Sequence, residues 1–233
     1  GPDSLAAIKS QVILEPADRD LLCDPQRPIL LVRKSSHFSL SPQIAPGLTD
    51  IGVMLPYSPL HHLLLAELAT PVIATSANIS GEPVLTDNVE VEQRLSHVAD
   101  AFLHHNRPIV RPADDSVFRT IAGKPRPLRL GRGQAPLELT LPLNLPQPLL
   151  AVGAHLKNTV ALAWQNRVVV SPHIGDLDSP RSLDIFLQVS QDLQQLYNIQ
   201  ATTIICDAHP HYANSRWAKQ SGLPVIPVFH HHA

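Results

Sequence analysis

Residues 75–83, TSANISGEP, crowd hydroxyl and carboxamide side chains into a stretch that directly follows the apolar run PVIA. Small side chains after a strand let backbone N–H groups approach a phosphate or a carboxylate. The hydroxyls of Thr75, Ser76 and Ser80 add donors, and Asn78 can both donate to and accept from a planar amide or a base. This chemistry suits an acyl phosphate or an adenylate. Asn and Ser are also common turn residues, so a plain turn is the alternative.

A second polar group lies in the stretch RPIVRPADDSVFR and in the residues that follow it. Asp114 and Asp115 could orient neighbouring arginines, help to hold a metal ion or cap a turn, and these readings stay open. Guanidinium groups are always charged and grip phosphate with two hydrogen bonds. The cations available for an anionic intermediate are Arg119, Arg129 and Arg132, each with a solvated surface role as its alternative.

The elements that must position these groups alternate between helix and strand over residues 1–135. Helical stretches are expected around residues 5–11 and 16–22, followed by a strand in RPILLVRK and a short strand over 51–55. Pro59 marks the first turn of a helix. Further strands are expected in PVIAT, RPIV and SVFRTIAG, with a helix over about 88–102 between the first two. The mixture indicates an α/β domain.

A proline-rich stretch separates this segment from the next. Residues 136–148 carry Pro at 136, 142, 146 and 148, which excludes a regular helix and removes backbone donors from any sheet. We interpret it as an extended linker. Over residues 149–233 we expect a β-hairpin, a third strand, a helix capped by Ser179, a buried strand ATTIICD, a short helix near NSRWAKQ and a final strand PVIPVF. This order matches the opening half of an actin-like, ribonuclease-H-like α/β fold.

Composition restricts the class of protein. The 233 residues are 44% apolar, enough to fill a core, and the net charge of −2 comes from interspersed signs, so no nucleic-acid partner is expected. No apolar run reaches the length of a membrane span, and the first residues lack the pattern of a signal peptide, so we expect a cytoplasmic protein without a membrane partner. Cys23 and Cys206 are far apart in sequence and fit a reducing compartment.

TSANISGEP resembles the TSANxSGxP signature of the YrdC-like family, which joins small carbonyl acids to AMP. Five further stretches, together with the terminal HHHA, follow in the order found in the HypF family of carbamoyltransferases: GVMLPYSPLHHLLL, RPIVRPADDSVFR, GAHLKNTVALA, SPHIGDL and CDAHPHYANSRWA. Together they cover nearly the whole chain. The sequence therefore resembles an internal piece of such a protein, with a YrdC-like domain over 1–135 whose N-terminal part is missing and the start of an actin-like carbamoyltransferase domain over 149–233.

The resemblance implies that carbamoyl phosphate and ATP, with Mg²⁺, form carbamoyl-adenylate in the first domain. The carbamoyl group then passes to the C-terminal cysteine of the partner HypE, for the cyanide ligand of [NiFe] hydrogenase. Ser76 and Asn78 match positions near the adenylate, Thr75 and Ser80 shape the loop, and Ser116 matches a serine beside phosphate. Leu130 replaces an arginine of the family pattern. No catalytic residue is assigned.

In the second domain the resemblance places Lys157 and Asn158 in a hairpin turn that serves nucleotide phosphates. His230 matches one histidine of a family pair that binds iron or zinc. His209 with Asp207 follows a buried strand, a position from which loops serve sites in α/β folds, and a structural histidine is the alternative.

The implied parent protein is an enzyme, and the piece by itself is expected to be inactive. Two other classes stay open. One is a noncatalytic module that binds a nucleotide or a partner. The other comprises related enzymes, either an O-carbamoyltransferase or a tRNA threonylcarbamoyl-adenylate synthase.

Overall fold

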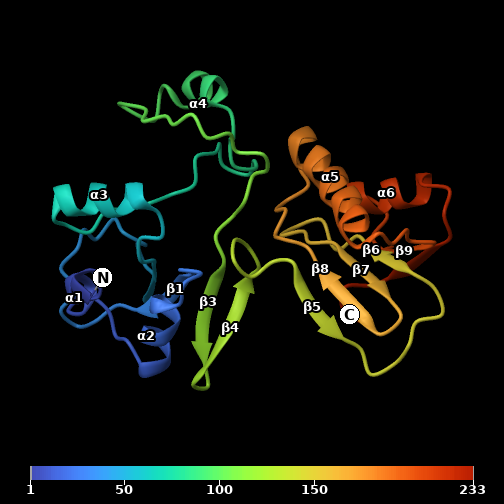
Figure 1. The fold of residues 1–233 in the computed structure, drawn as a ribbon, viewed down its shortest axis with the longest axis horizontal. Helices are drawn as coiled ribbons and strands as arrows, with labels where there is room; N and C mark the ends of the chain where they lie inside the picture. The colour runs from blue at the N-terminus through green and yellow to red at the C-terminus, as the bar shows by residue number, and fades with distance from the viewer. Residues whose placement is uncertain (1, 233) are drawn as a thin grey trace. The chain divides into compact units, whose positions relative to one another are not determined.

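The computed structural model describes residues 2–232 and divides the chain into two compact units. The first consists of Gly1–Thr75 and Asp115–Gln134, and the second of Ser76–Asp114 and Ala135–Ala233. Each unit holds one sheet that mixes parallel and antiparallel pairs, flanked by helices (Figure 1). The predicted α/β class is therefore confirmed.

The first unit contains a four-stranded sheet in the order β2-β1-β3-β4. β1 pairs in parallel with β3, and the other two pairs are antiparallel. Ser58 starts α3 because its side chain accepts a hydrogen bond from the backbone of His61, one turn inside the helix. The elements are α1 (Pro2–Ile8), α2 (Pro16–Cys23), β1 (Ile29–Arg33), β2 (Asp50–Val53), α3 (Pro59–Leu68), β3 (Val117–Ile121) and β4 (Lys124–Arg129).

A small apolar core holds the first unit together. Alternate residues of β1, Leu30 and Val32, point inward with Phe118 of β3 and Leu22 of α2, and all are buried. This alternation is what a strand with one buried face requires. α3 adds nothing to the core, because none of its residues is buried.

The second unit contains a six-stranded sheet in the order β10-β9-β6-β7-β8-β5. β10, β9 and β6 are parallel neighbours, whereas β6-β7-β8-β5 is antiparallel. The predicted hairpin, third strand, helix and buried strand are all present. The elements are α4 (Asn88–Leu95), β5 (Leu137–Thr140), β6 (Leu149–Ala151), β7 (Ala161–Trp164), β8 (Arg167–Val170), α5 (Pro180–Tyr197), β9 (Thr203–Asp207), α6 (Ala213–Gln220) and β10 (Val225–Val228).

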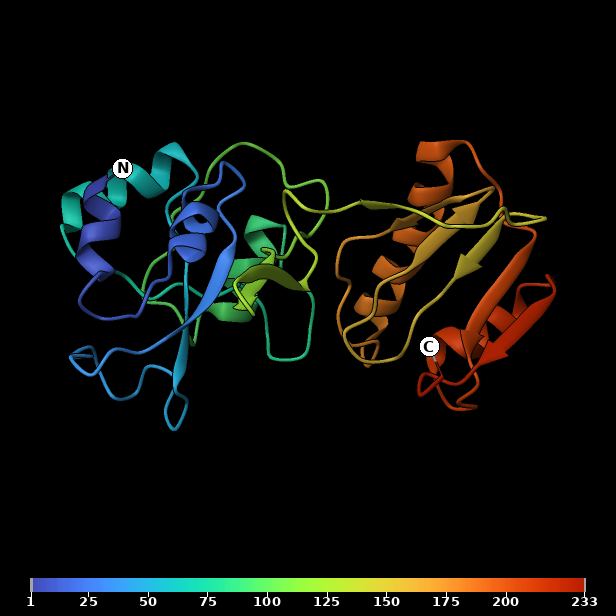
Figure 2. The same ribbon diagram turned by 90° about the horizontal axis from the view of Figure 1, so that it is seen from below.

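Helix α5 covers the core of the second unit and runs along its sheet (Figures 1 and 2). Ser179 caps its first turn and Pro180 occupies the first helical position, as the sequence predicts. Phe186 is fully buried against the sheet residues, and its ring meets Trp217 of α6 edge to face at 5.3 Å. Within residues 2–232 no helix combines the length and the apolarity needed to cross a membrane.

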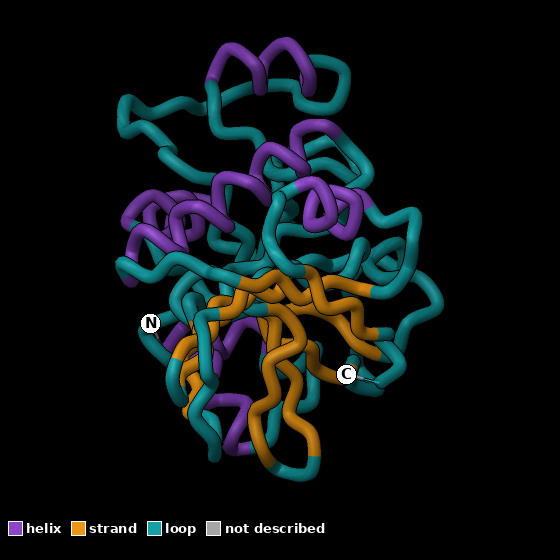
Figure 3. Tube along the Cα trace, turned by 90° about the vertical axis from the view of Figure 1, so that its right-hand side faces the viewer, coloured by secondary structure: helices purple, strands orange, loops and turns teal. Residues whose placement is uncertain are grey.

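Three sequence expectations are corrected. PVIAT and RPIV form loops, not strands, and α4 ends at Leu95 rather than near residue 102 (Figures 1 and 3). Ile73 and Val110 are 78% and 86% exposed. A strand needs a neighbouring strand for its backbone groups, and an apolar run alone does not supply one. α4 buries no residue, so packing does not extend it.

Part of the predicted linker belongs to a sheet. Leu137–Thr140 forms β5 and pairs with β8 at the edge of the six-stranded sheet. These four residues lie between Pro136 and Pro142 and contain no proline, so every one of them keeps its backbone N–H for the ladder. The proline-rich composition of the whole stretch concealed this short strand.

The edge formed by β5 and β8 carries a surface cluster of charged and aromatic groups. Glu138 accepts hydrogen bonds from the Tyr197 hydroxyl at 2.8 Å and from Arg167 at 2.7 Å. The bond from Tyr197, followed by that from Arg167, lowers the pKa of Glu138. Burial and the same carboxylate raise the pKa of Tyr197. The cluster therefore favours ionised Glu138.

The Phe186→Ala substitution should lower the free energy of unfolding of the second unit by about 3–5 kcal/mol, because it opens a cavity between α5 and the sheet. Chemical denaturation measures the change. Leu196, 68% exposed on the same helix, is the control, and Leu196→Ala should change stability by no more than about 0.5 kcal/mol. Equal losses from the two substitutions would contradict the packing described here.

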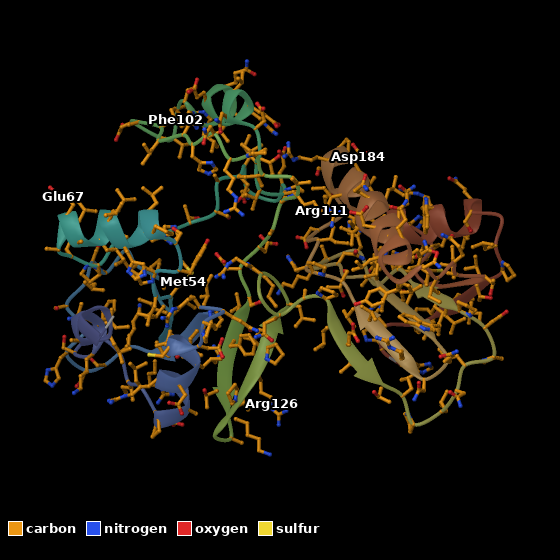
Figure 4. All side chains as sticks on the ribbon, viewed as in Figure 1. Met54, Glu67, Phe102, Arg111, Arg126 and Asp184 are labelled. Atoms are coloured by element: carbon orange, nitrogen blue, oxygen red, sulfur yellow. The ribbon has the colours of Figure 1, made fainter. Side chains whose placement is uncertain are left out.

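The Glu138→Gln substitution should remove part of the pH dependence of stability. A carboxylate whose pKa is lower in the folded state stabilises the fold above its unfolded pKa, and that contribution disappears as the pH falls through the folded pKa. The variant should be less stable than the wild type at pH 7 and should lose less on acidification. Thermal unfolding measured from pH 7 downward tests it, with Asp184→Asn, at an exposed position of α5, as the control (Figure 4).

Candidate functional site

The TSANISG stretch forms a turn at the surface whose polar groups bond mainly to one another. The Ser76 hydroxyl donates to the side-chain oxygen of Asn78. The Asn78 amide nitrogen donates to the carbonyls of Ile79 at 2.9 Å and Glu82 at 3.0 Å. Gly81, with φ of +82°, lets the chain turn back. The oxygen and the nitrogen of the Asn78 carboxamide therefore both form hydrogen bonds that close the turn.

The hydroxyl-bearing residues of this turn remain accessible. Thr75, Ser76 and Ser80 are exposed, and Asn78 is half-buried, so none faces a dry interior. Ser76 and Asn78 belong to the second compact unit, whereas Ser116 belongs to the first. That these residues share an adenylate pocket stays a prediction.

Ser116 is fully buried and joins two segments of the first unit. Its hydroxyl donates to the carbonyl of Arg132 at 3.1 Å and accepts from the backbone N–H of Gly131 at 2.9 Å. A hydroxyl has one proton to donate. Ser116 therefore fixes the chain that follows β4, and in this conformation its proton faces a backbone carbonyl.

Arg132 is held on all sides by the first unit. Its guanidinium donates to Asp115 at 2.9 Å and to the carbonyls of Gln26 at 2.8 Å and Arg27 at 3.0 Å. It also lies 3.7 Å from the ring centroid of Tyr57. Burial, and next the charge of Asp115, raise the pKa of Tyr57, while Arg132 opposes them. Asp115 thus orients an arginine, one of the roles left open by the sequence.

The other two candidate arginines differ in availability. Arg119 forms an ion pair with Asp50 at 2.7 Å. Arg129, opposite Val117 in the β3–β4 ladder, has no side-chain partner among residues 2–232. Of the three predicted cations, Arg129 is the one that the described residues leave free for an anion.

Asp114 pairs with a histidine of its own unit rather than with an arginine. Its carboxylate lies 2.6 Å from the Nδ1 atom of His173, in the loop after β8. Neighbouring residues of the segment 76–114 also contact α5. Arg111, labelled in Figure 4, pairs with Asp192 at 2.9 Å, and Arg181 pairs with Glu90 at 2.7 Å. Adjacent carboxylates, Asp114 and Asp115, thus belong to different units.

In the second unit, three neighbouring parallel strands have their carboxyl-terminal ends side by side, and these ends form the carboxyl-terminal edge of the sheet. β6, β9 and β10 pair in parallel, so the loops that follow them lie at the same edge. From β6 the chain continues into β7 on one side, and β9 lies on the other side. Ligands of open α/β sheets bind at such carboxyl-terminal edges, where the connections diverge. This edge is the candidate site of the second unit.

The loop after β6 presents one exposed cation and one buried amide. Lys157 is exposed, and its backbone N–H donates to Asp176 at 2.7 Å. Asn158 is only 1% exposed, and its side chain donates to the carbonyls of Val152 and Ala154. Gly153 has φ of +66°, and a Cβ there would lie 2.2 Å from the Thr159 oxygen. Lys157 is therefore the member of the predicted pair whose side chain is open to a ligand.

The loops after β9 and β10 meet at Asp207. One oxygen of this buried carboxylate accepts from the backbone of His209 at 2.8 Å, and the other lies 2.8 Å from Nδ1 of His230. The ring of His209 stacks on Tyr212 at 4.1 Å, and His155 stacks on the same ring at 5.2 Å. The loops from β6 and β9 are thus in contact.

His230 suits a metal only as one ligand of a larger set. A histidine ligand usually places its second ring nitrogen against a carboxylate, and Asp207 fills that role here. Within residues 2–232, however, no three His, Cys, Asp or Glu side chains are grouped as metal ligands. The predicted iron or zinc site therefore has one candidate ligand and one carboxylate beside it.

The sequence reasoning missed two partners. His173 faces Asp114, and Asn214 of α6 donates to the loop after β6. Neither residue stands in a pattern that indicates its role, because each partner is more than 50 positions away along the chain. A single polar residue in a short predicted helix carries no signal of the loop that it contacts.

Two family models match the chain, one after the other. The model described as Telomere recombination, of the Sua5, YciO and YrdC proteins, matches residues 3–131. The model described as HypF Kae1-like domain matches residues 144–233.

Similar proteins carry both halves. Carbamoyltransferase HypF of Synechocystis sp. is 47% identical over 92% of this chain and 28% of its own length, and that of Rhizobium leguminosarum is 40% identical over 92% and 29%. This chain thus spans less than a third of these relatives. The crystal structure titled full-length HypF in the phosphate- and nucleotide-bound form is 37% identical, with a TM-score of 0.92 over 98% of this chain and 36% of that one. The chain belongs to the HypF family.

Proposed function

We propose that the protein to which this chain belongs is a carbamoyltransferase that works in two steps. In the first step, water cleaves carbamoyl phosphate into carbamate and inorganic phosphate. The carbamate oxygen then attacks the α-phosphorus of ATP, pyrophosphate leaves, and carbamoyl-adenylate forms. The thiolate of the C-terminal cysteine of HypE then attacks the carbamoyl carbon, and AMP leaves. The carbamoyl group of this thioester is the precursor of the cyanide ligand of [NiFe] hydrogenase.

The observation that carries this proposal is the joint match of both halves to carbamoyltransferases named HypF, at 47% identity for the Synechocystis protein. The match of residues 144–233 to the HypF Kae1-like domain disfavours a stand-alone synthase of threonylcarbamoyl-adenylate. A relative crystallised with phosphate and nucleotide supports a nucleotide as ligand.

The chemistry asks the protein mainly to orient two reactants and to neutralise phosphate. A carbamate is a poor electrophile until it carries a good leaving group, and AMP supplies one. Ser76 and Asn78 are the proposed contacts of the adenylate, and Thr75 and Ser80 shape that turn. Arg129 is the free cation, whereas Arg119, Arg132 and Ser116 are bonded to other residues of the first unit.

Lys157 is the proposed phosphate cation of the second domain. Mg²⁺ would neutralise the phosphates of ATP in the first step. His230 would hold iron or zinc together with ligands outside the described residues, and Asp207 would orient its ring. Neither metal is needed to explain the contacts described above.

The full-length protein that contains this sequence should catalyse exchange of pyrophosphate into ATP only when carbamoyl phosphate is present. Adenylate formation is reversible in such an assay, so labelled pyrophosphate reports the first step alone. Threonine with bicarbonate is the control substrate and should support no exchange. Exchange that follows threonine, or no exchange with either substrate, would refute the proposed first step.

Replacement of Arg129 by alanine should raise the KM for ATP in this assay about tenfold, which corresponds to about 1.4 kcal/mol of lost phosphate binding. Arg126, an exposed arginine of the same strand β4 that is labelled in Figure 4, provides the control. Arg126→Ala should leave the KM unchanged. If both substitutions have the same effect, Arg129 acts only through the general charge of the hairpin.

A further inference from the structure

Two buried asparagines hold the loop after β6 by its carbonyl oxygens. The Nδ2 atom of Asn214 lies 2.8 Å from the Val152 oxygen, 2.8 Å from that of Gly153 and 3.2 Å from that of Ala154. The Nδ2 atom of Asn158 lies 2.9 Å from the Val152 oxygen and 2.6 Å from that of Ala154. Carbonyl oxygens only accept hydrogen bonds, so both carboxamides must face them with their donors.

This arrangement stands out because both side chains are inside the protein. Asn214 is 0% and Asn158 is 1% exposed. A buried carboxamide without partners is costly, and here the donors of two residues from different elements converge on three consecutive carbonyls. The Asn158 oxygen meanwhile has no partner among the described residues. Its orientation thus satisfies the loop and leaves its own acceptor unused.

The hydrogen bonds from the two asparagines determine where the neighbouring backbone N–H groups point. In a trans peptide the C=O of one residue and the N–H of the next point in opposite directions. Because the carbonyls of residues 152–154 turn toward the buried amides, the N–H groups of residues 153–155 turn away from them. These three N–H groups have no acceptor within residues 2–232. Gly153 and Lys157 are exposed in the same loop.

Successive N–H groups that point the same way form a concave site for an anion. We propose that Asn214 and Asn158 are positioning residues of the second domain, which hold the N–H groups of residues 153–155 ready for the phosphates of a nucleotide. This inference rests on the proposed nucleotide site of the second domain. In this proposal the Asn158 side chain acts inside the loop and does not contact the nucleotide. Asn214, on α6, orients the same backbone N–H groups.

The test measures hydrogen exchange of peptides covering residues 152–157, with and without Mg·ATP, in the full-length protein that contains this sequence. In the wild type, Mg·ATP should slow exchange there. Asn214→Asp is nearly isosteric but replaces donors with acceptors, so it should weaken the apparent affinity for Mg·ATP at least about tenfold. Asn214→Ser keeps one donor, should cause a smaller loss, and provides the measurement if the aspartate variant does not fold.

Thr203→Val is the matched control for loss of stability. Thr203 is also buried, and its hydroxyl accepts from Gln147 at 2.8 Å at the opposite end of β9. This variant should unfold at a lower temperature, yet Mg·ATP should still protect residues 152–157. Equal affinity losses in the Thr203 and Asn214 variants, or full protection in Asn214→Asp, would overturn the positioning role. Absence of protection in the wild type would instead refute the proposed nucleotide site, and the inference with it.

Discussion

The parallel pairing of β6 with β9 is the constraint on which the site of the second unit depends. It brings the ends of two strands more than 50 residues apart to one edge, so that the loop at Gly153 lies within reach of Asn214 on the helix that follows β9. The buried carboxamides then decide the direction of each peptide group in that loop.

The first unit uses the same principle with different groups. Ser116 and Arg132 fix the chain after β4 through backbone carbonyls and N–H groups, and Asp115 fixes Arg132. These polar residues, which the sequence offers as ligand-binding groups, thus form hydrogen bonds with other residues of the first unit. Arg129 is set apart because the described residues offer its side chain no such partner. Residues of the same type therefore differ in whether the described residues supply their side chains with partners.

Most elements of the second unit could be predicted from local patterns. Ser179 and Pro180 predict the start of α5, and the apolar run that ends at Asp207 predicts β9. The errors have a common physical origin. PVIAT and RPIV have the composition of strands but no neighbouring strand, and Leu137–Thr140 pairs with β8 although prolines surround it. Pairing between distant segments decides these cases, and composition does not report it.

The sequence by itself determined the family, the α/β class, and the supply of hydroxyls, carboxamides and arginines, because these depend on residue identity and order. Only the tertiary structure decided which of these groups are buried and which residues they bond to. Asn158 is buried and Lys157 is exposed although they are adjacent, and Asp114 and Asp115 join different units. Adjacent side chains point in different directions, and some buried polar groups, such as the Asn214 carboxamide, bond to a remote part of the chain.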